Sequence, residues 1–265
     1  MKHRHWALPA VAVAVLAAIL VVRHVRRPPF EHAPSTTAGG ARVEVDRVRE
    51  PVVAGAFYPG DPDELAEQVD GLLAEVSPAP VPNLRGLVCP HAGYVYSGLT
   101  AAYCYKLLQG RKVDTVAVLG PSHKHRFVGV SIPAVDAYRT PLGLMLLSAD
   151  VSRFANRGPF VSEPEAHRSE HSLEVQLPFL QRVVGEAKLV PMVFGQADPT
   201  EVAAELGEHL SPDTLVVASS DLSHYHPYEV ARKLDRSTID AVLALDLERM
   251  KGAQACGKGP IMALI

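Results

Sequence analysis

The sequence predicts a single α/β domain with a central, mostly parallel or mixed sheet flanked by helices. Short runs of branched apolar residues, typical of buried strands, alternate along the chain with longer segments of helical periodicity. The three clearest strand runs are 86–89, 114–120 and 214–220. Each is followed at once by polar residues, and open α/β sheets bind their ligands beyond the carboxyl ends of the strands. The same pattern therefore predicts both the fold and the place to look for chemistry.

Composition excludes several classes of protein. The chain has 265 residues, 48% of them hydrophobic, which is enough for a large core. Its 29 acidic residues outnumber its 26 Lys and Arg residues, and the part after residue 27 has no long basic run, so we expect no nucleic-acid partner. The three cysteines form no CxxC pair, and an odd number of thiols argues against a disulfide framework.

Residues 1–27 contain an apolar core, 7–22, with basic residues on both sides. This core is short for a helix that spans a bilayer, which needs roughly 17–25 apolar residues. A cleavage site with small residues does not follow it, as it would in a secretory signal. We favour an uncleaved membrane anchor with the main domain in the cytoplasm, because more basic residues follow the core than precede it. A cleaved signal peptide and a misplaced start codon are the alternatives.

Residues 28–45, rich in Pro, Ala, Thr and Gly, are predicted to be a linker, and residues 46–265 the folded domain. Within the domain, an Asp cap and apolar residues at helical spacing predict a helix over 61–76. Further helices are predicted over 97–108, 149–155, 199–210 and 228–247, and one that opens at Ser169. Further strands are predicted over 128–135, 142–147 and 188–194, with a turn at 138–141.

The domain is expected to be truncated at its C-terminus. The glycine-rich stretch 252–259 leads to Pro260, a residue type that favours the first turn of a helix, and the chain stops five residues later.

Residues with metal-binding or catalytic side chains follow the predicted strands. His91 follows the first strand, His123 the second, and Asp221 with His224 the third, while Cys256 precedes the last helix. Imidazole and thiolate are the usual ligands of zinc, iron and copper. A single such residue is more often a hydrogen-bonded turn residue, a packed thiol or a helix cap. Their coincidence at several strand ends predicts a metal or catalytic site.

Glu170, His171 and Glu174 form a second candidate group. At spacings of three and four residues they would share one face of the helix that opens at Ser169. A solvated helix face is an equally good interpretation of the same spacing. Tyr94 and Tyr96, just beyond His91, are candidates for the wall of a cleft.

Five motifs follow one another along the predicted domain. They are Pro-His-Ala-Gly-Tyr at 90–94, Leu-Gly-Pro-Ser-His at 119–123, Glu-His-Ser-Leu-Glu at 170–174, Ser-Ser-Asp-Leu-Ser-His at 219–224, and Ala-Cys-Gly at 255–257. Together they resemble the Memo family, the Memo-like protein B of the AmmeMemoRadiSam system. The resemblance covers roughly residues 47–265.

The resemblance implies a fold like that of the class III extradiol non-haem iron dioxygenases. It implies a metal, Fe(II) or copper, held by His91, His123 and Cys256, with His224 as acid or base and Asp221 orienting it. Because the third ligand would be a thiol and not the carboxylate of those dioxygenases, ring cleavage is not expected. The implied partners are a radical-SAM protein and an AMMECR-type protein.

Two functions from different classes follow. The first is a metal-dependent oxidoreductase. The second is a binding module that kept the fold and recognises a peptide or partner, with Tyr58, Tyr94 and Tyr96 along its cleft. Convergence of the two histidines and the thiol on one point would favour the first.

Overall fold

The predicted buried strands pair in one six-stranded mixed sheet. The computed structural model describes residues 45–155 and 157–265, and its strands in this sheet run in the order β2-β9-β3-β8-β4-β7. The first four are parallel to one another, whereas β4 is antiparallel to β8. The strands are β2 (Gly86–Cys89), β9 (Leu215–Ser219), β3 (Thr115–Pro121), β8 (Lys188–Phe194), β4 (Val130–Ser131) and β7 (Phe160–Val161). The predicted α/β fold with a central sheet is confirmed.

A small second sheet has three strands, of which the sequence predicted only the last. Its order is β1 (Val48–Arg49), β5 (Ala137–Thr140) and β6 (Gly143–Leu146). The predicted turn at 138–141 is wrong, because residues 137–140 pair antiparallel with residues 143–146. The chain reverses at residues 141–142. The next residue, Gly143, has a φ of 117°, a value that favours glycine because glycine has no Cβ.

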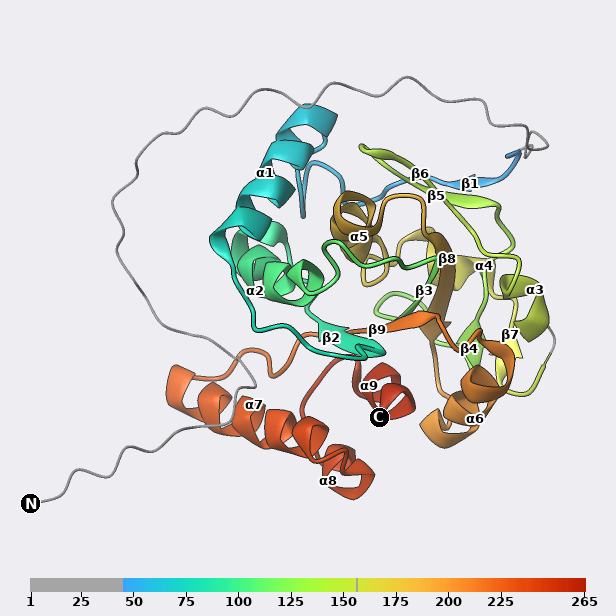
Figure 1. The fold of residues 1–265 in the computed structure, drawn as a ribbon. Coiled ribbons are helices and arrows are strands. Elements are labelled where there is room, and N and C mark those ends of the chain that lie inside the picture. Colours follow the sequence, from blue (N-terminus) through green and yellow to red (C-terminus); the bar gives the residue numbers. More distant parts are fainter. Residues whose placement is uncertain (1–44, 156) are drawn as a thin grey trace, which may run out of the picture. The chain divides into compact units, whose positions relative to one another are not determined.

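Helices cover both faces of the large sheet (Figure 1). On one face lie α1 (Pro62–Glu75), α2 (Tyr94–Lys106) and α5 (Leu177–Val184), which pack on one another around the main core. On the other face lie α6 (Pro199–His209) and α9 (Lys258–Leu264), with α7 (Tyr228–Leu243) and α8 (Leu247–Lys251) beside α9.

Helix α1 illustrates how local sequence produces this packing. The side chain of Asp61 accepts hydrogen bonds from the backbone N–H groups of Asp63 and Glu64, and so caps the first turn. Leu65, Val69 and Leu73 recur every four residues and are all buried. Burying each of these side chains contributes about 1.5–3 kcal/mol, so this apolar stripe holds the helix on the core.

The helix predicted to open at Ser169 does not form there. Two short helices precede this residue, α3 (Val151–Phe154) and α4 (Pro164–Arg168). Helix α4 ends just before Ser169. The chain then turns until η1 (Glu174–Gln176), which continues into α5. The Glu170 carboxylate accepts from the N–H groups of His171 and Ser172. These bonds replace helical ones, so Glu170, His171 and Glu174 do not share a helix face.

The predicted membrane-anchored localisation requires correction. Across residues 45–155 and 157–265, none of the helices is both long and apolar enough to cross a membrane. The segment to which the anchor was assigned, residues 1–27, lies outside the described residues, as does the linker up to residue 44.

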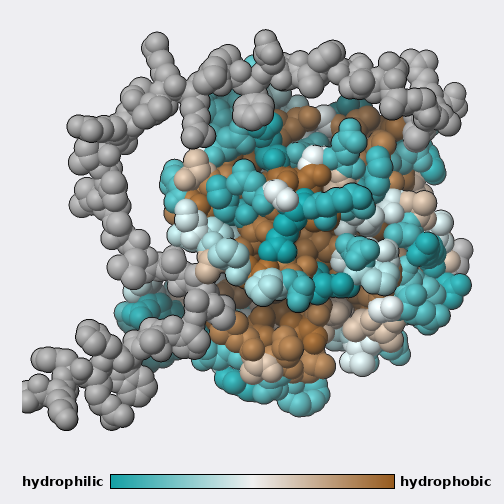
Figure 2. All heavy atoms as spheres, viewed as in Figure 1, coloured by the Kyte–Doolittle hydropathy of each residue, from teal (hydrophilic) through white to brown (hydrophobic). Residues whose placement is uncertain are grey.

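Apolar side chains gather at the surface over α9 (Figure 2). Ile261 and Ala263 face the sheet and are buried, whereas Met262, Leu264 and Ile265 are only partly buried. The Leu264 side chain lies against Gly86 of β2, where an added Cβ would clash with it at 2.4 Å. Gly86 therefore allows α9 to approach the sheet closely.

Candidate metal centre

The carboxyl ends of three adjacent parallel strands bring the predicted residues together. His91 lies two residues beyond β2, His123 two beyond β3 and Asp221 two beyond β9. Because β9 lies between β2 and β3, all three residues meet at one edge of the sheet. The backbone N–H of His91 donates to Asp221 Oδ1 at 2.8 Å, which joins the ends of β2 and β9 directly.

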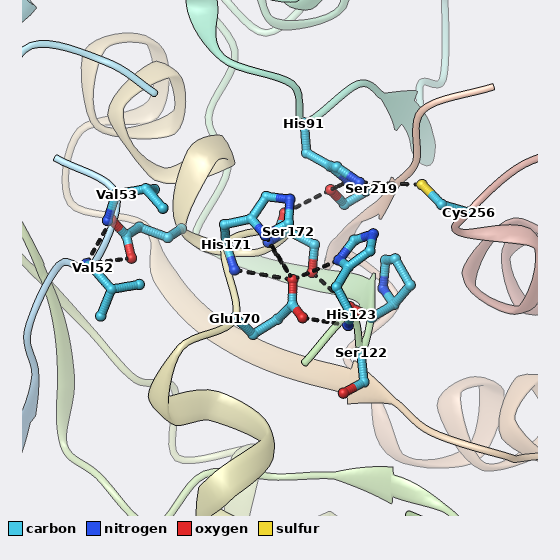
Figure 3. A network of polar contacts seen from close by, with 12 residues as sticks. Val52, Val53, His91, Ser122, His123, Glu170, His171, Ser172, Ser219 and Cys256 are labelled. Atoms are coloured by element: carbon cyan, nitrogen blue, oxygen red, sulfur yellow. Dashed lines mark hydrogen bonds and ion pairs between the residues drawn. The ribbon is translucent and has the colours of Figure 1, made fainter. Parts of the chain in front are cut away.

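Three histidine side chains converge at this edge (Figure 3). One ring nitrogen from each of His91, His123 and His171 lies within 4.8 Å of the others, an arrangement that could hold a metal ion. The rings of His123 and His171 stack with centroids 4.6 Å apart, and the ring of His91 meets both edge-on. The spacing of His171 from Glu170 and Glu174 predicted only a secondary role for it, and the structure gives it a more central position.

The thiol of Cys256 lies beside the histidines. Its Sγ is 3.2 Å from Nε2 of His91 and accepts a hydrogen bond from the backbone N–H of Asp221, also at 3.2 Å. Metal–nitrogen bonds of about 2.0–2.1 Å and metal–sulfur bonds of about 2.3 Å can span two atoms at this separation. Cys256 and His91 are therefore close enough to bind one ion together.

The environment of Cys256 favours the thiolate. Burial raises the pKa of this thiol, but the hydrogen bonds that it receives, among them those from His123 and from the backbone N–H of Asp221, outweigh burial and lower the pKa to about 6. Thiolate is the form that binds metals. The contact between Cys256 and His123 also changes the pKa of the histidine. Hydrogen bonds to Cys256 and, second in size, to Glu170 raise the pKa of His123 to about 9.

A buried carboxylate orients His123. Glu170 Oε1 accepts from Nδ1 of His123 at 2.9 Å, and its Oε2 accepts from the backbone N–H of the same residue at 2.6 Å. Burial raises the pKa of Glu170, but the bonds from His123 and from the N–H of Ser172 lower it to about 2. The carboxylate is thus charged and holds His123 by Nδ1, which leaves Nε2 as the nitrogen for a metal.

His91 is held in a matching way. Its Nδ1 lies 2.8 Å from the hydroxyl of Ser219, the last residue of β9, and both side chains are buried. His91 and His123 therefore both use Nδ1 for an outer hydrogen bond. Metal-binding histidines usually show this arrangement, so the donors present fit a metal ion such as iron, copper or zinc.

Asp221 and His224 lie at the rim. Asp221 Oδ2 is 3.9 Å from Nε2 of His91 and 3.9 Å from Nε2 of His224, both longer than a hydrogen bond. The His224 side chain is 44% exposed. His224 is thus accessible to solvent, and Asp221 lies between it and His91.

The remaining candidates lie elsewhere. Tyr94 is buried and donates to the backbone oxygen of Val175, so it belongs to the core and not to a cleft wall. Tyr96 is 85% exposed on α2. The side chain of Glu174 faces Arg49 and Tyr58, away from the histidines. Tyr58 is itself buried there.

The sequence indicated no role for the residues that support the histidines. Ser219 and Gln176 form a buried polar group behind His91, in which Gln176 Nε2 donates to Ser219 Oγ at 2.8 Å. The available signal was small. Ser219 is a polar residue at the end of an apolar strand run, and Gln176 is a polar residue inside the apolar stretch 173–180.

Comparison with known proteins identifies the family of this chain. The model of the Memo family, described as Memo-like protein, matches residues 49–265. A MEMO1 family protein of Methanopyrus kandleri is 38% identical over 243 residues, which cover 82% of this chain and 85% of that protein. A MEMO1 family protein of Methanosarcina barkeri is 39% identical over 236 residues, covering 82% of this chain and 86% of the relative. One of Aquifex aeolicus is 41% identical over 211 residues, covering 77% and 78%. The chain belongs to the Memo family.

Proposed function

We propose that this protein binds a redox-active metal ion, iron or copper, through His91, His123 and Cys256. The observation that supports this best is the convergence of the histidine nitrogens within 4.8 Å, with the Cys256 thiol 3.2 Å from His91. His171 belongs to the same cluster and is a candidate for a further ligand. This convergence favours the metal-dependent function over the peptide-binding alternative.

The proposed activity is that of an oxidoreductase, oxidase-like or dioxygenase-like. A bound ion would supply Lewis-acid and one-electron redox chemistry, for which a thiolate and two imidazoles are suitable ligands. Glu170 keeps the imidazole of His123 oriented. His224, exposed at the rim and 3.9 Å from Asp221, takes up or releases protons at its ring nitrogen.

The proposed partners come from the resemblance alone. Members of the AmmeMemoRadiSam system would place this protein beside a radical-SAM protein and an AMMECR-type protein. Pull-down of separately purified partners with this protein, with and without added iron, would test this proposal.

Anaerobic titration with Fe(II) and Cu(I) tests the metal site. We expect wild type to bind one equivalent, and His123→Gln and Cys256→Ser each to lose affinity at least tenfold. His125→Gln is the matched control, because His125 lies two residues from His123 but faces Glu163, with Nε2 3.5 Å from its carboxylate. Equal metal uptake by wild type and by all three variants would rule the site out.

A further inference from the structure

The buried polar group behind His91 determines which of its ring nitrogens carries hydrogen. Nδ1 of His91 lies 2.8 Å from Ser219 Oγ, and this distance alone does not say which atom donates. A neutral imidazole has one N–H donor and one acceptor nitrogen, and a serine hydroxyl has one donor and two acceptor lone pairs. The direction of this bond therefore follows from the other partners of Ser219.

Two other partners of Ser219 fix its hydroxyl. Ser219 Oγ lies 2.6 Å from the backbone oxygen of Ser172, a carbonyl that can only accept, so the hydroxyl hydrogen points there. Gln176 Nε2 lies 2.8 Å from the same Oγ and donates to it. These two bonds use the hydroxyl hydrogen and one lone pair of Ser219 Oγ. Its other lone pair, left for Nδ1 of His91, can only accept a hydrogen bond.

The orientation of the Gln176 amide is determined independently. Its Nε2 also donates to the backbone oxygen of Pro90 at 2.9 Å, and its Oε1 accepts from the Tyr105 hydroxyl at 2.6 Å. Turning the amide over would bring Oε1 against the carbonyl oxygen of Pro90, where two acceptors would meet without a hydrogen. Gln176 is buried, so water cannot relieve that contact.

We propose that Gln176 and Ser219 are positioning residues that hold His91 as its Nδ1–H tautomer and so present the Nε2 lone pair to the metal. The inference rests on the proposed metal site, but the tautomer itself does not require a metal. Nε2 is the nitrogen that lies 3.2 Å from Cys256 Sγ, so the selected lone pair faces the candidate ligand thiol. The network joins the ends of β2 and β9 to α2 and η1, and every side chain in it is buried.

Two measurements test this proposal on isotope-labelled protein. The first is the tautomer of His91 in metal-free protein, from long-range ¹H–¹⁵N NMR correlations assigned with His91→Gln. The second is Zn(II) affinity, measured by competition with a chromophoric chelator. We expect wild type to show Nδ1–H, and Ser219→Ala to shift toward Nε2–H with affinity about 10–100-fold weaker, the usual effect of losing an outer hydrogen bond to a metal-binding histidine.

Ser131→Ala is the matched control. Ser131 is an equally buried serine whose Oγ lies 3.0 Å from Nε2 of His167, outside the histidine cluster. We expect it to change neither the His91 tautomer nor Zn(II) affinity. Gln176→Met, which removes both amide donors but leaves Ser219 in place, is a second variant in case Ser219→Ala does not fold. We expect it to weaken Zn(II) binding by about tenfold or less.

The outcomes separate the two proposals. If wild type binds none of Zn(II), Fe(II) and Cu(I), the metal function fails, while the tautomer measurement still decides the hydrogen-bond assignment. If wild type binds metal but His91 carries its hydrogen on Nε2, or if Ser219→Ala keeps both tautomer and affinity, the positioning role is overturned.

Discussion

Glu170 and Glu174 are both buried carboxylates, four residues apart, yet they serve different parts of the molecule. Glu174 pairs with Arg49, accepts from the N–H groups of Val52 and Val53, and accepts from the Tyr58 hydroxyl. These bonds fasten β1 and the loop after it to η1. Glu170 instead accepts from the ring and backbone of His123 and faces the candidate metal centre.

The difference shows that burial alone does not identify a functional carboxylate. The charge of Glu174 is balanced by a guanidinium that also donates to the backbone oxygens of His167 and Glu170, so it is enclosed in structural contacts. The charge of Glu170 is balanced by an imidazole whose other nitrogen is available to the centre. The partner of each carboxylate, and what that partner touches, distinguishes the two roles.

The largest expected effect is on stability, from Glu174→Gln. The substitution leaves the buried Arg49 guanidinium without its counter-charge, and breaking a buried ion pair from one side costs about 3–5 kcal/mol. Urea denaturation should show that loss in the free energy of unfolding. Asp70→Asn is the control, because Asp70 pairs with Arg182 at the exposed surface and should lose at most about 1 kcal/mol. Equal losses in the two variants would contradict the structural role of Glu174.

The next effect in size is a loss of stability at low pH, caused by His167. His167 is buried between Tyr138 and Ser131 and faces the charges of Arg49 and Glu170. Burial lowers its pKa to about 4, against about 6.5 in the unfolded chain. Between pH 4 and 6.5 the unfolded state therefore binds more protons than the folded state. The contribution of neutral His167 to the free energy of unfolding is complete above pH 6.5 and is lost as the pH falls to 4. The loss should reach about 3 kcal/mol.

Urea denaturation at pH 7, 6, 5 and 4 measures this dependence. His167→Gln, which cannot titrate, should show a shallower decline over the same range. A wild-type free energy of unfolding that stays level from pH 6.5 to 4 would show that His167 does not titrate as its burial requires.

Glu170→Gln should mainly weaken metal binding, whereas Glu174→Gln should mainly lower stability. The amide removes the negative charge that orients His123, so metal affinity should fall by about 10–100-fold, with a loss of stability of about 1–3 kcal/mol from the altered hydrogen bonds. Anaerobic Fe(II) titration measures the first quantity. Folded Glu174→Gln should keep wild-type affinity in the same assay. If both variants bind metal equally, the two carboxylates do not differ in the way their contacts indicate.

The sequence predicted the strand ends well because a buried strand followed by a polar turn is a local signal. His91, His123 and Asp221 were placed at one edge by that signal and by the parallel order of the strands. The position of His171 was not predictable in this way. It depends on a turn between α4 and η1 that the carboxylate of Glu170 stabilises through two backbone N–H groups, a contact invisible to helical periodicity.

Glu174 was misassigned for a related reason. Its spacing from Glu170 suggested a shared helix face, but its partners Arg49 and Tyr58 lie more than a hundred residues away in the sequence. Similarly, the hydrogen bond between Ser219 and His91 spans 128 residues. Contacts of this kind are set by the packing of the whole domain, so no window along the chain contains them.

The smallest predicted effect tests one bond of the Glu174 network. The hydroxyl of Tyr58 donates to Glu174 Oε1 at 2.6 Å, and Tyr58→Phe removes only this group. Burial and the nearby Glu174 charge raise the pKa of Tyr58, so the phenol stays protonated as a donor. Because the N–H groups of Val52 and Val53 still serve the carboxylate, we expect a loss of about 1–2 kcal/mol in the free energy of unfolding. Metal affinity should not change, since Tyr58 lies on the side of Glu174 and not of Glu170. A variant that instead lost metal affinity while keeping its stability would show that the two carboxylate networks act as one.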